Sequence, residues 1–261
     1  MQLLLSLGAS VVDADIHPPA ESIDPSAAFT FHHTDVTSWA DLTALFKRTK
    51  DLHRRIDHVF ANAGISPRTN YLTLEVDDDG ELKEPQSPTI EVNMKGAINT
   101  AILAIHHMRN QPDPVGGSIV ITCSIASVQR FRSVDYTTAK HAVLGFMRAM
   151  KPLLEHEKIP IRINGVAPSW TQTGIIPEKL MSEMGIKLQT PFEVGRAAAG
   201  LMADQSRHGH LIHIAEGRYK EIDEAVLVPA YMGILGEGNV LEDTTLGHMM
   251  EAMGGVYKDK V

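Results

Sequence analysis

The sequence lacks the features that mark disulfide-rich, membrane-spanning and nucleic-acid-binding proteins. Its 261 residues include one cysteine, Cys123, which excludes an internal disulfide and a cysteine-based zinc site. No stretch approaches ~18 uninterrupted apolar residues, so no membrane span is expected. Lys and Arg number 24 against 32 Asp and Glu, without a dense basic run, and we expect no nucleic-acid partner. These absences favour a reducing, cytoplasmic location.

The histidines also lack a metal-binding pattern. Thirteen are present, but no pair has the His-Glu-x-x-His spacing of a zinc enzyme. We therefore predict no metal site. No internal repeat is visible either.

What is present is a series of short apolar strands that alternate with helical patterns. Hydrophobic residues make up 43% of the chain, enough for a sizeable core. A helix begins after Asp35-Val36, where Thr37 or Ser38 can cap it. Strands are predicted at 10–14, 29–33, 56–61, 117–124, 161–167 and 211–215, and helices at 89–109, 136–157 and 192–203. This alternation predicts a doubly wound parallel sheet in three α/β/α layers.

The two ends of the chain look different from the middle. Residues Met1 to Ser10 have no positive charge, and Asp13 and Asp15 follow at once, so we expect the last turns of a helix ended by Gly8 rather than a secretory signal. Residues 218–261 are rich in Met and Gly and predict a helical or loose tail that covers a pocket. We accordingly divide the chain into a domain at 1–217 and a tail at 218–261.

Three polar residues stand out by position. Ser124 ends a predicted strand, Tyr136 begins a helix twelve residues later, and Lys140 shares a helix face with Tyr136. A nearby ammonium lowers the pKa of a phenol from about 10, which makes tyrosine usable as a general acid or base. Ser124 can hold the same substrate oxygen. Taken alone, however, a Tyr-x-x-x-Lys pair occurs on many helices and favours a solvated helix face.

The neighbouring motifs change that interpretation. Asn62-Ala63-Gly64 follows one predicted strand, Asn93 lies in the next helix, Asp35-Val36 follows an earlier strand, and Pro168 to Thr173 follow a later one. Together with Ser124, Tyr136 and Lys140, this set resembles the short-chain dehydrogenase/reductase family from about Leu3 to about Gly217. The resemblance implies a Rossmann-like fold and an NAD- or NADP-dependent enzyme.

The resemblance also implies a role for each matching residue. Tyr136 is expected to be the general acid or base, Lys140 to lower its pKa and bind the nicotinamide ribose, Ser124 to orient the substrate oxygen, and Asn93 to hold a water that relays protons. The remaining residues are expected to contact the cofactor: Asn62, Ala63, Gly64, Asp35 and Val36 along its length, and Pro168, Thr171 and Thr173 at the nicotinamide amide. An Asx-turn or N-cap explains Asp35 nearly as well, and Ser169 stands where the family usually has glycine.

Asp15 ends the first predicted strand. A carboxylate at this position in dinucleotide-binding folds hydrogen-bonds the adenosine ribose and repels a 2′-phosphate. No Arg or Lys precedes Lys47. We therefore predict NAD, with NADP as the alternative; a loop-capping aspartate is the simpler structural role.

The sequence departs from the family at its beginning. The Gly-rich turn between the first strand and first helix is absent, and roughly 20 to 25 residues are missing relative to that pattern. The missing strand belongs in the middle of the sheet, so its two neighbours are expected to lose ladder partners. Either the chain starts at an internal methionine of a longer enzyme, which we favour, or the short form is real and impaired in cofactor binding.

We therefore expect an oxidoreductase that interconverts a secondary alcohol and a ketone on an apolar small molecule. A non-redox isomerase or cyclase on the same scaffold, or a catalytically silent binding protein, are the alternatives. The family implies a homodimer or homotetramer formed by the helices that carry Asn93 and Tyr136.

Overall fold

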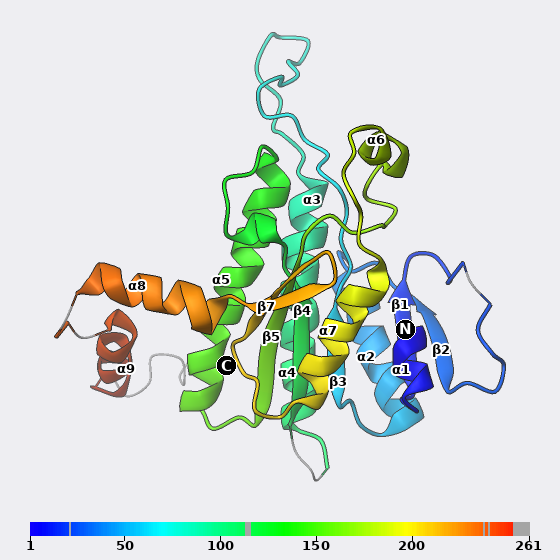
Figure 1. Ribbon diagram of the computed structural model, residues 1–261, viewed down its shortest axis with the longest axis vertical. Helices are drawn as coiled ribbons and strands as arrows, with labels where there is room; N and C mark the ends of the chain where they lie inside the picture. Colours follow the sequence, from blue (N-terminus) through cyan, green and yellow to red (C-terminus); the bar gives the residue numbers. More distant parts are fainter. Residues whose placement is uncertain (21, 113–115, 237, 240, 253–261) are drawn as a thin grey trace.

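The structure is a computed structural model that describes residues 1–20, 22–112, 116–236, 238–239 and 241–252. Seven strands form two sheets (Figure 1). β1 (Val11–Asp15) pairs in parallel with β2 (Phe29–His33) in a two-stranded sheet. The second sheet has the order β3-β4-β5-β6-β7, with strands β3 (His58–Ala61), β4 (Gly117–Thr122), β5 (Ile161–Pro168), β6 (Leu211–Ala215) and β7 (Arg218–Glu221).

Helices cover both faces of the sheets, which gives the three α/β/α layers that the sequence predicts. One layer contains α2 (Trp39–His53), the π-helical segment η1 (Glu91–Gly96) with α4 (Ala97–Arg109), and α5 (Val134–His156). The other contains α1 (Gln2–Ser6) and α7 (Pro191–Ala203), which contact each other. The shorter elements are α3 (Pro88–Ile90), the 3₁₀ turn η2 (Ile125–Ser127), α6 (Glu178–Glu183) and the π-helical segment η3 (Asp223–Leu227).

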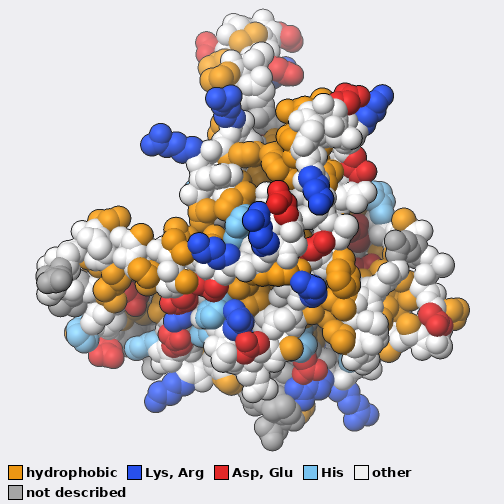
Figure 2. Space-filling view, in the orientation of Figure 1, with side chains coloured by type: hydrophobic (Ala, Val, Ile, Leu, Met, Phe, Trp, Pro, Cys, Tyr) orange, Lys and Arg blue, Asp and Glu red, His pale blue; other side chains and the backbone are white. Residues whose placement is uncertain are grey.

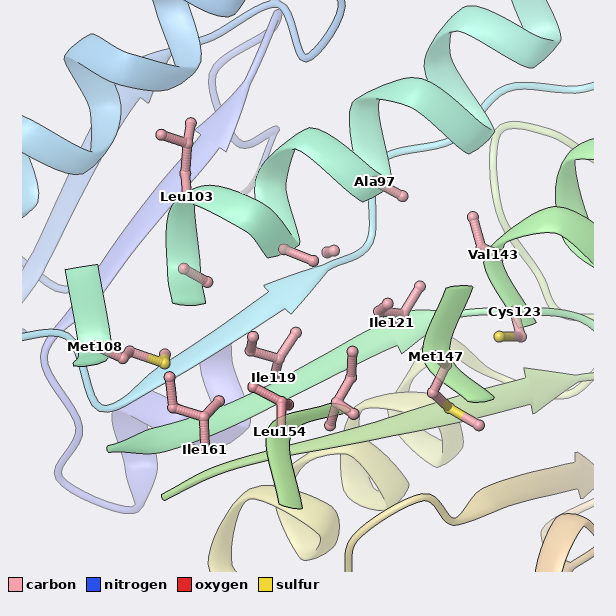
Figure 3. Packing of buried hydrophobic residues seen from close by; sticks show 14 of the residues in the cluster. Ala97, Leu103, Met108, Ile119, Ile121, Cys123, Val143, Met147, Leu154 and Ile161 are labelled. Carbon is pink, nitrogen blue, oxygen red and sulfur yellow. The ribbon is translucent and has the colours of Figure 1, made fainter. Parts of the chain in front are cut away.

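The core follows from the period-two alternation of β4 and β5. Ile119, Ile121 and Ile161 pack toward α4 and α5, together with Met108 and Leu154 (Figure 3). On the opposite face, residues of the same strands, Val120 and Val166, pack in a second cluster with α7. Because both faces are covered, the strands are almost continuously apolar.

Local signals in the sequence place several element ends correctly. Ser38 caps α2, where its hydroxyl accepts a hydrogen bond from the Asp41 amide (3.2 Å). Gly8 follows α1 in the left-handed region (φ +83°), as expected for a residue that ends a helix. The single helix expected at 89–109 is α3, η1 and α4 in continuous succession.

The expected loss of ladder partners is confirmed in the described residues. Among the described residues, β1 pairs only with β2, and β3 pairs only with β4, so each of β1 and β3 has one edge without a partner strand. Between β1 and β3 lies a cavity of about 790 Å³, lined by residues of both strands. We call this space the β1–β3 groove.

The C-terminal segment differs in part from the expected tail. Residues 218–221 form β7, which pairs antiparallel with β6 and extends the sheet. After η3, α8 (Val228–Leu235) and α9 (Glu242–Ala252) project from the body, and hydrophobic side chains gather over α8 (Figures 1 and 2). That this tail covers a pocket stays a prediction, and residues 253–261 lie outside the described residues. No helix in the described ranges is long and apolar enough to cross a membrane.

Candidate active site

Ser124 and Tyr136 meet at the carboxyl end of β4. Ser124 caps the η2 turn, and its hydroxyl accepts a hydrogen bond from the Ala126 amide (3.2 Å), which fixes the side chain. The Tyr136 phenol, in the first turn of α5, lies close enough to the Ser124 side chain for this hydroxyl to lower the pKa of the phenol. The structure therefore brings together two hydroxyl groups that can share one substrate oxygen.

Lys140 lies one turn further along α5 and is buried, with 3% of its surface exposed. Its Nζ lies 5.6 Å from the centroid of the Tyr136 ring and donates a hydrogen bond to the Thr122 carbonyl oxygen (2.7 Å). Burial lowers the pKa of Lys140 to about 8. The amine is therefore mostly charged at neutral pH but close to its titration range.

The pKa of Tyr136 departs from the expectation. Lys140 was expected to lower it, but burial raises the pKa of the phenol, and the nearby Ser124 hydroxyl opposes that rise only in part. The physical reason is desolvation of the phenolate, which outweighs the neighbouring groups. In this state the phenol is a proton donor at neutral pH.

Thr122 connects this cluster to the next strand, which the sequence analysis missed. Its hydroxyl donates to the Asn62 Oδ1 (2.8 Å), while its carbonyl holds Lys140. Asn62 and Ala63 are exposed directly after β3. The position of Thr122 as the last residue of β4 was the available signal, because ligands bind at the carboxyl ends of parallel strands.

Asn93 holds the backbone of the segment that follows β3 through hydrogen bonds to Ile65. It is fully buried in η1, accepts a hydrogen bond from the Ile65 amide (2.7 Å) and donates one to the Ile65 carbonyl (2.9 Å). Gly64 lies so close that a Cβ there would be 3.3 Å from the Asn93 Oδ1. Asn93 thus positions residues 62–65, and its role in holding a water stays a prediction.

Asp135 is a second residue that the sequence analysis missed, although it directly precedes Tyr136. It is fully buried and accepts hydrogen bonds from the amides of Tyr136 (2.8 Å), Arg68 (2.9 Å) and Thr69 (3.2 Å). Burial raises its pKa, but these hydrogen bonds and the nearby Thr89 side chain lower it more, so the net direction is downward. The carboxylate holds the start of α5 against the loop after β3.

The residues expected at the adenosine end lie around the carboxyl ends of β1 and β2. Asp15 is exposed, and its carboxylate accepts a hydrogen bond from the His17 amide (3.0 Å). Asp35 forms the Asx-turn that the sequence left open, accepting from the Thr37 amide (2.8 Å) and hydroxyl (2.7 Å). Asp15, Val36, Asn62 and Ala63 all line the β1–β3 groove.

The residues expected at the nicotinamide amide lie after β5, which ends at Pro168. Thr171 is buried and uses its hydroxyl within the loop, donating to the Ser169 carbonyl (2.9 Å) and accepting from the Gln189 Nε2 (3.0 Å). Thr173 is exposed. Of this group, Thr173 has the side chain most accessible to a ligand.

The comparisons with known proteins agree with this geometry. The family model for short chain dehydrogenases matches residues 3–183. The short-chain dehydrogenase/reductase ascJ of Acremonium egyptiacum is 50% identical over 261 residues, covering 99% of this chain and 88% of that protein. The short-chain dehydrogenase/reductase ATR7 of Stachybotrys chlorohalonatus is 35% identical, covering 87% of this chain and 67% of its own length.

Solved structures support the fold. Levodione reductase aligns with a TM-score of 0.61 at 22% identity, over 74% of this chain and 78% of that one. A putative gluconate dehydrogenase from Agrobacterium tumefaciens aligns with a TM-score of 0.65 at 21% identity, over 82% of this chain and 87% of that one. The matched motifs, the Rossmann-like layers and these relatives lead to one conclusion: the chain belongs to the short-chain dehydrogenase/reductase family.

Proposed function

We propose that this protein interconverts a secondary alcohol and a ketone with a nicotinamide cofactor, and that Tyr136 transfers the proton. The observation that carries the proposal is the contact of the Tyr136 phenol with Ser124, with the Lys140 ammonium over the same ring. When bound, a nicotinamide cofactor would supply the hydride chemistry at the alcohol or ketone carbon. The protein must then supply or remove one proton at the substrate oxygen.

The three side chains divide this task. Ser124 hydrogen-bonds the substrate oxygen and holds it beside the phenol. In reduction, Tyr136 gives its proton to that oxygen and becomes a phenolate; in oxidation it takes the alcohol proton. The buried Lys140 ammonium stabilises the phenolate that forms, because a charge acts strongly where water is excluded.

The residues around the site fit the two ends of a nicotinamide cofactor. Lys140 and Asn62 are joined through Thr122 at the end where the reacting ring would lie. Asp15 has an exposed carboxylate at the adenosine end, which favours NAD because it would repel a 2′-phosphate. We assign no residue to the pyrophosphate, since the sequence has no Gly-rich turn before β1.

An apolar substrate is supported by an aromatic pair from the segments that precede α5 and follow β5. Phe131, five residues before Tyr136, and Trp170, two residues after β5, lie with ring centroids 6.0 Å apart. Both rings remain partly exposed. Such a pair suits an apolar molecule with a ring or branched chain. A reducing, cytoplasmic location stays our expectation from the single, buried Cys123.

The test is turnover of a panel of secondary alcohols with NAD and with NADP. We expect the reduced nicotinamide and the ketone to form in equal amounts, faster with NAD. Equal or better rates with NADP would overturn the assignment of Asp15. Consumption of substrate without any change in nicotinamide absorbance would instead favour an isomerase or cyclase.

A further inference from the structure

Residues 65–69 connect two parts of the candidate active site, and we call them the 65–69 segment. The segment follows residues 62–64, which are expected to contact the cofactor. It then contacts the first turn of α5, where Tyr136 lies. The position of this segment therefore relates the proposed proton donor to the expected cofactor-binding residues.

Two buried side chains hold the first half of the 65–69 segment. Asn93 in η1 bonds both the amide and the carbonyl of Ile65. The Thr89 hydroxyl, in α3, donates to the Ser66 carbonyl (3.2 Å). Both side chains are fully buried, so the backbone of this half is held by two different elements.

Asp135 joins the second half of the segment to the first turn of α5. Its Oδ2 accepts hydrogen bonds from the amides of Arg68 (2.9 Å) and Thr69 (3.2 Å). Its Oδ1 accepts a hydrogen bond from the Tyr136 amide (2.8 Å). Because both oxygens belong to one planar carboxylate, the segment and the turn that carries the phenol are held in a fixed relation.

The start of α5 alone would not require a buried carboxylate. A serine at the N-cap can satisfy the first amides of a helix, but the Ser133 side chain makes no such capping bond within the described residues. Asp135 instead places an ionised group where none of its surface is exposed, which costs free energy unless hydrogen bonds compensate it. Two of its three amide partners lie outside the helix.

The link between segment and helix also depends on the carboxylate itself. An ionised carboxylate accepts hydrogen bonds at both oxygens, whereas an amide of the same shape has one acceptor oxygen and one NH₂ donor. An asparagine at position 135 would therefore turn its NH₂ group toward an amide donor, either of Tyr136 or of the 65–69 segment. One side of the link would be lost.

We propose that Asp135 is a positioning residue for the proton transfer, which holds the Tyr136 phenol beside the substrate oxygen by fixing the first turn of α5 to the 65–69 segment. It acts through Tyr136 and touches neither substrate nor cofactor. The proposal rests on the proposed oxidoreductase function and extends it from the reacting side chains to the link that aligns them.

The first test is the kinetics of Asp135→Asn with a secondary alcohol that the unmodified chain oxidises. We expect kcat per folded chain to fall by about 10- to 100-fold, because a displacement of about 1 Å can cost about 10²-fold in rate. The KM values for alcohol and cofactor should change much less, since the side chains expected to bind them are unaltered.

A solvent isotope effect separates misplacement of the phenol from a general loss of structure. When the phenol is displaced, proton transfer becomes slower relative to the step at the substrate carbon. The ratio of kcat in H₂O to kcat in D₂O should therefore rise in Asp135→Asn. A smaller folded fraction would lower the measured rate without changing this ratio.

Two further variants serve as controls. Glu155→Gln removes a carboxylate from the other end of the same helix, where it is 53% exposed and pairs with Lys151 (3.2 Å). We expect unchanged kcat and an unchanged isotope ratio. Asp135→Glu keeps both acceptor oxygens and should recover part of the rate that Asp135→Asn loses.

Thr89→Val weakens the hold on the same segment without changing a charge. It should lower kcat less than Asp135→Asn does and raise the isotope ratio in the same direction. A folded Asp135→Asn chain with unchanged kcat, or with an unchanged isotope ratio, would overturn the proposal. If Asp135→Asn does not fold, unchanged kinetics in Thr89→Val would overturn it instead.

A measurement without substrate distinguishes failure of this proposal from failure of the proposed function. The Cζ signal of Tyr136 in ¹³C-tyrosine-labelled chain, assigned by its loss in Tyr136→Phe, reports the surroundings of the phenol. At pH 7 we expect Asp135→Asn and Thr89→Val to shift this signal and Glu155→Gln to leave it in place. An unchanged signal in folded Asp135→Asn would overturn the positioning role, whereas a shifted signal in a chain that oxidises no alcohol would overturn only the reaction.

Discussion

Lys140 shows at the scale of a residue how function and stability oppose each other. The fold buries an amine that carries a charge at neutral pH and that donates a hydrogen bond to the Thr122 carbonyl. The pKa of about 8, below the ordinary value of 10.5, expresses the cost of that burial. A residue that only stabilised the core would not need to be charged.

Replacing the amine should therefore stabilise the protein while abolishing its activity. Because the folded pKa is lowered, the unfolded chain binds the proton more tightly between about pH 8 and 10.5, and native stability rises with pH across that window. We expect Lys140→Met to be about 1–3 kcal/mol more stable at pH 7, with the difference shrinking toward pH 10.5. Urea unfolding at the two pH values measures this; a less stable variant at pH 7 would contradict the account.

Asp135 has the opposite dependence on pH. Its pKa is lowered in the folded state by hydrogen bonds to the Arg68, Thr69 and Tyr136 amides, so its contribution is present above the unfolded pKa of 3.8 and is lost as pH falls through the folded pKa. We expect Asp135→Asn to lose about 1–3 kcal/mol of stability at pH 7 and much less below pH 3.8. Denaturation at both pH values tests this, and an equal loss at both would exclude the charge as its cause.

At the scale of the elements, Gly96 at the junction of η1 and α4 packs against Val36, one of the residues expected to contact the cofactor. A Cβ added to Gly96 would lie 2.7 Å from the Val36 Cγ2 and 3.2 Å from the Val36 carbonyl oxygen. Real Cβ atoms do not approach so closely, so the loop after β2 would have to move. Gly96 is required here by a close approach and not by its backbone angles.

We therefore expect Gly96→Ala to destabilise the chain by about 1–3 kcal/mol and to weaken cofactor binding. Gly200→Ala is the matched control, because Gly200 lies in α7 with nothing within 4 Å of an added Cβ. That change should raise stability by up to about 1 kcal/mol. Thermal unfolding of both variants makes the comparison, and an unaffected Gly96→Ala chain would show that Val36 can move freely.

The elements also show what the sequence can and cannot predict. The strands β1 to β6 and the helices α2, α4, α5 and α7 follow from periodicity and caps such as Ser38, because a covered parallel sheet leaves a strong local pattern. β7 and α6 were not predicted, and α8 and α9 were predicted only as a helical or loose tail without bounds. Strand β7 has three charged side chains among its four residues, and its strand structure depends on its pairing with β6. The raised pKa of Tyr136 likewise depends on burial that no spacing reveals.

At the scale of the whole molecule, exposed apolar residues occur on the two helices, α4 and α5, through which the family is expected to assemble. Ile102 on α4 and Leu153 on α5 are both exposed. If these helices form the contact, as the family implies, Ile102→Arg should convert a dimer or tetramer into a monomer. Light scattering measures the mass of the assembly. Leu72→Arg, at a leucine that is 97% exposed in the loop before α3, should leave the assembly unchanged. A monomeric unmodified chain would refute the prediction.

The central claim concerns one proton, and the Tyr136→Phe variant tests it most directly. The change removes the phenol hydroxyl and leaves the ring beneath Lys140 in place, so folding should be retained. The measurement is the rate at which reduced nicotinamide forms from a secondary alcohol that the unmodified chain oxidises. The account predicts a fall of about 10²–10⁴-fold with normal circular dichroism, and a folded Tyr136→Phe chain with an unchanged rate would contradict it.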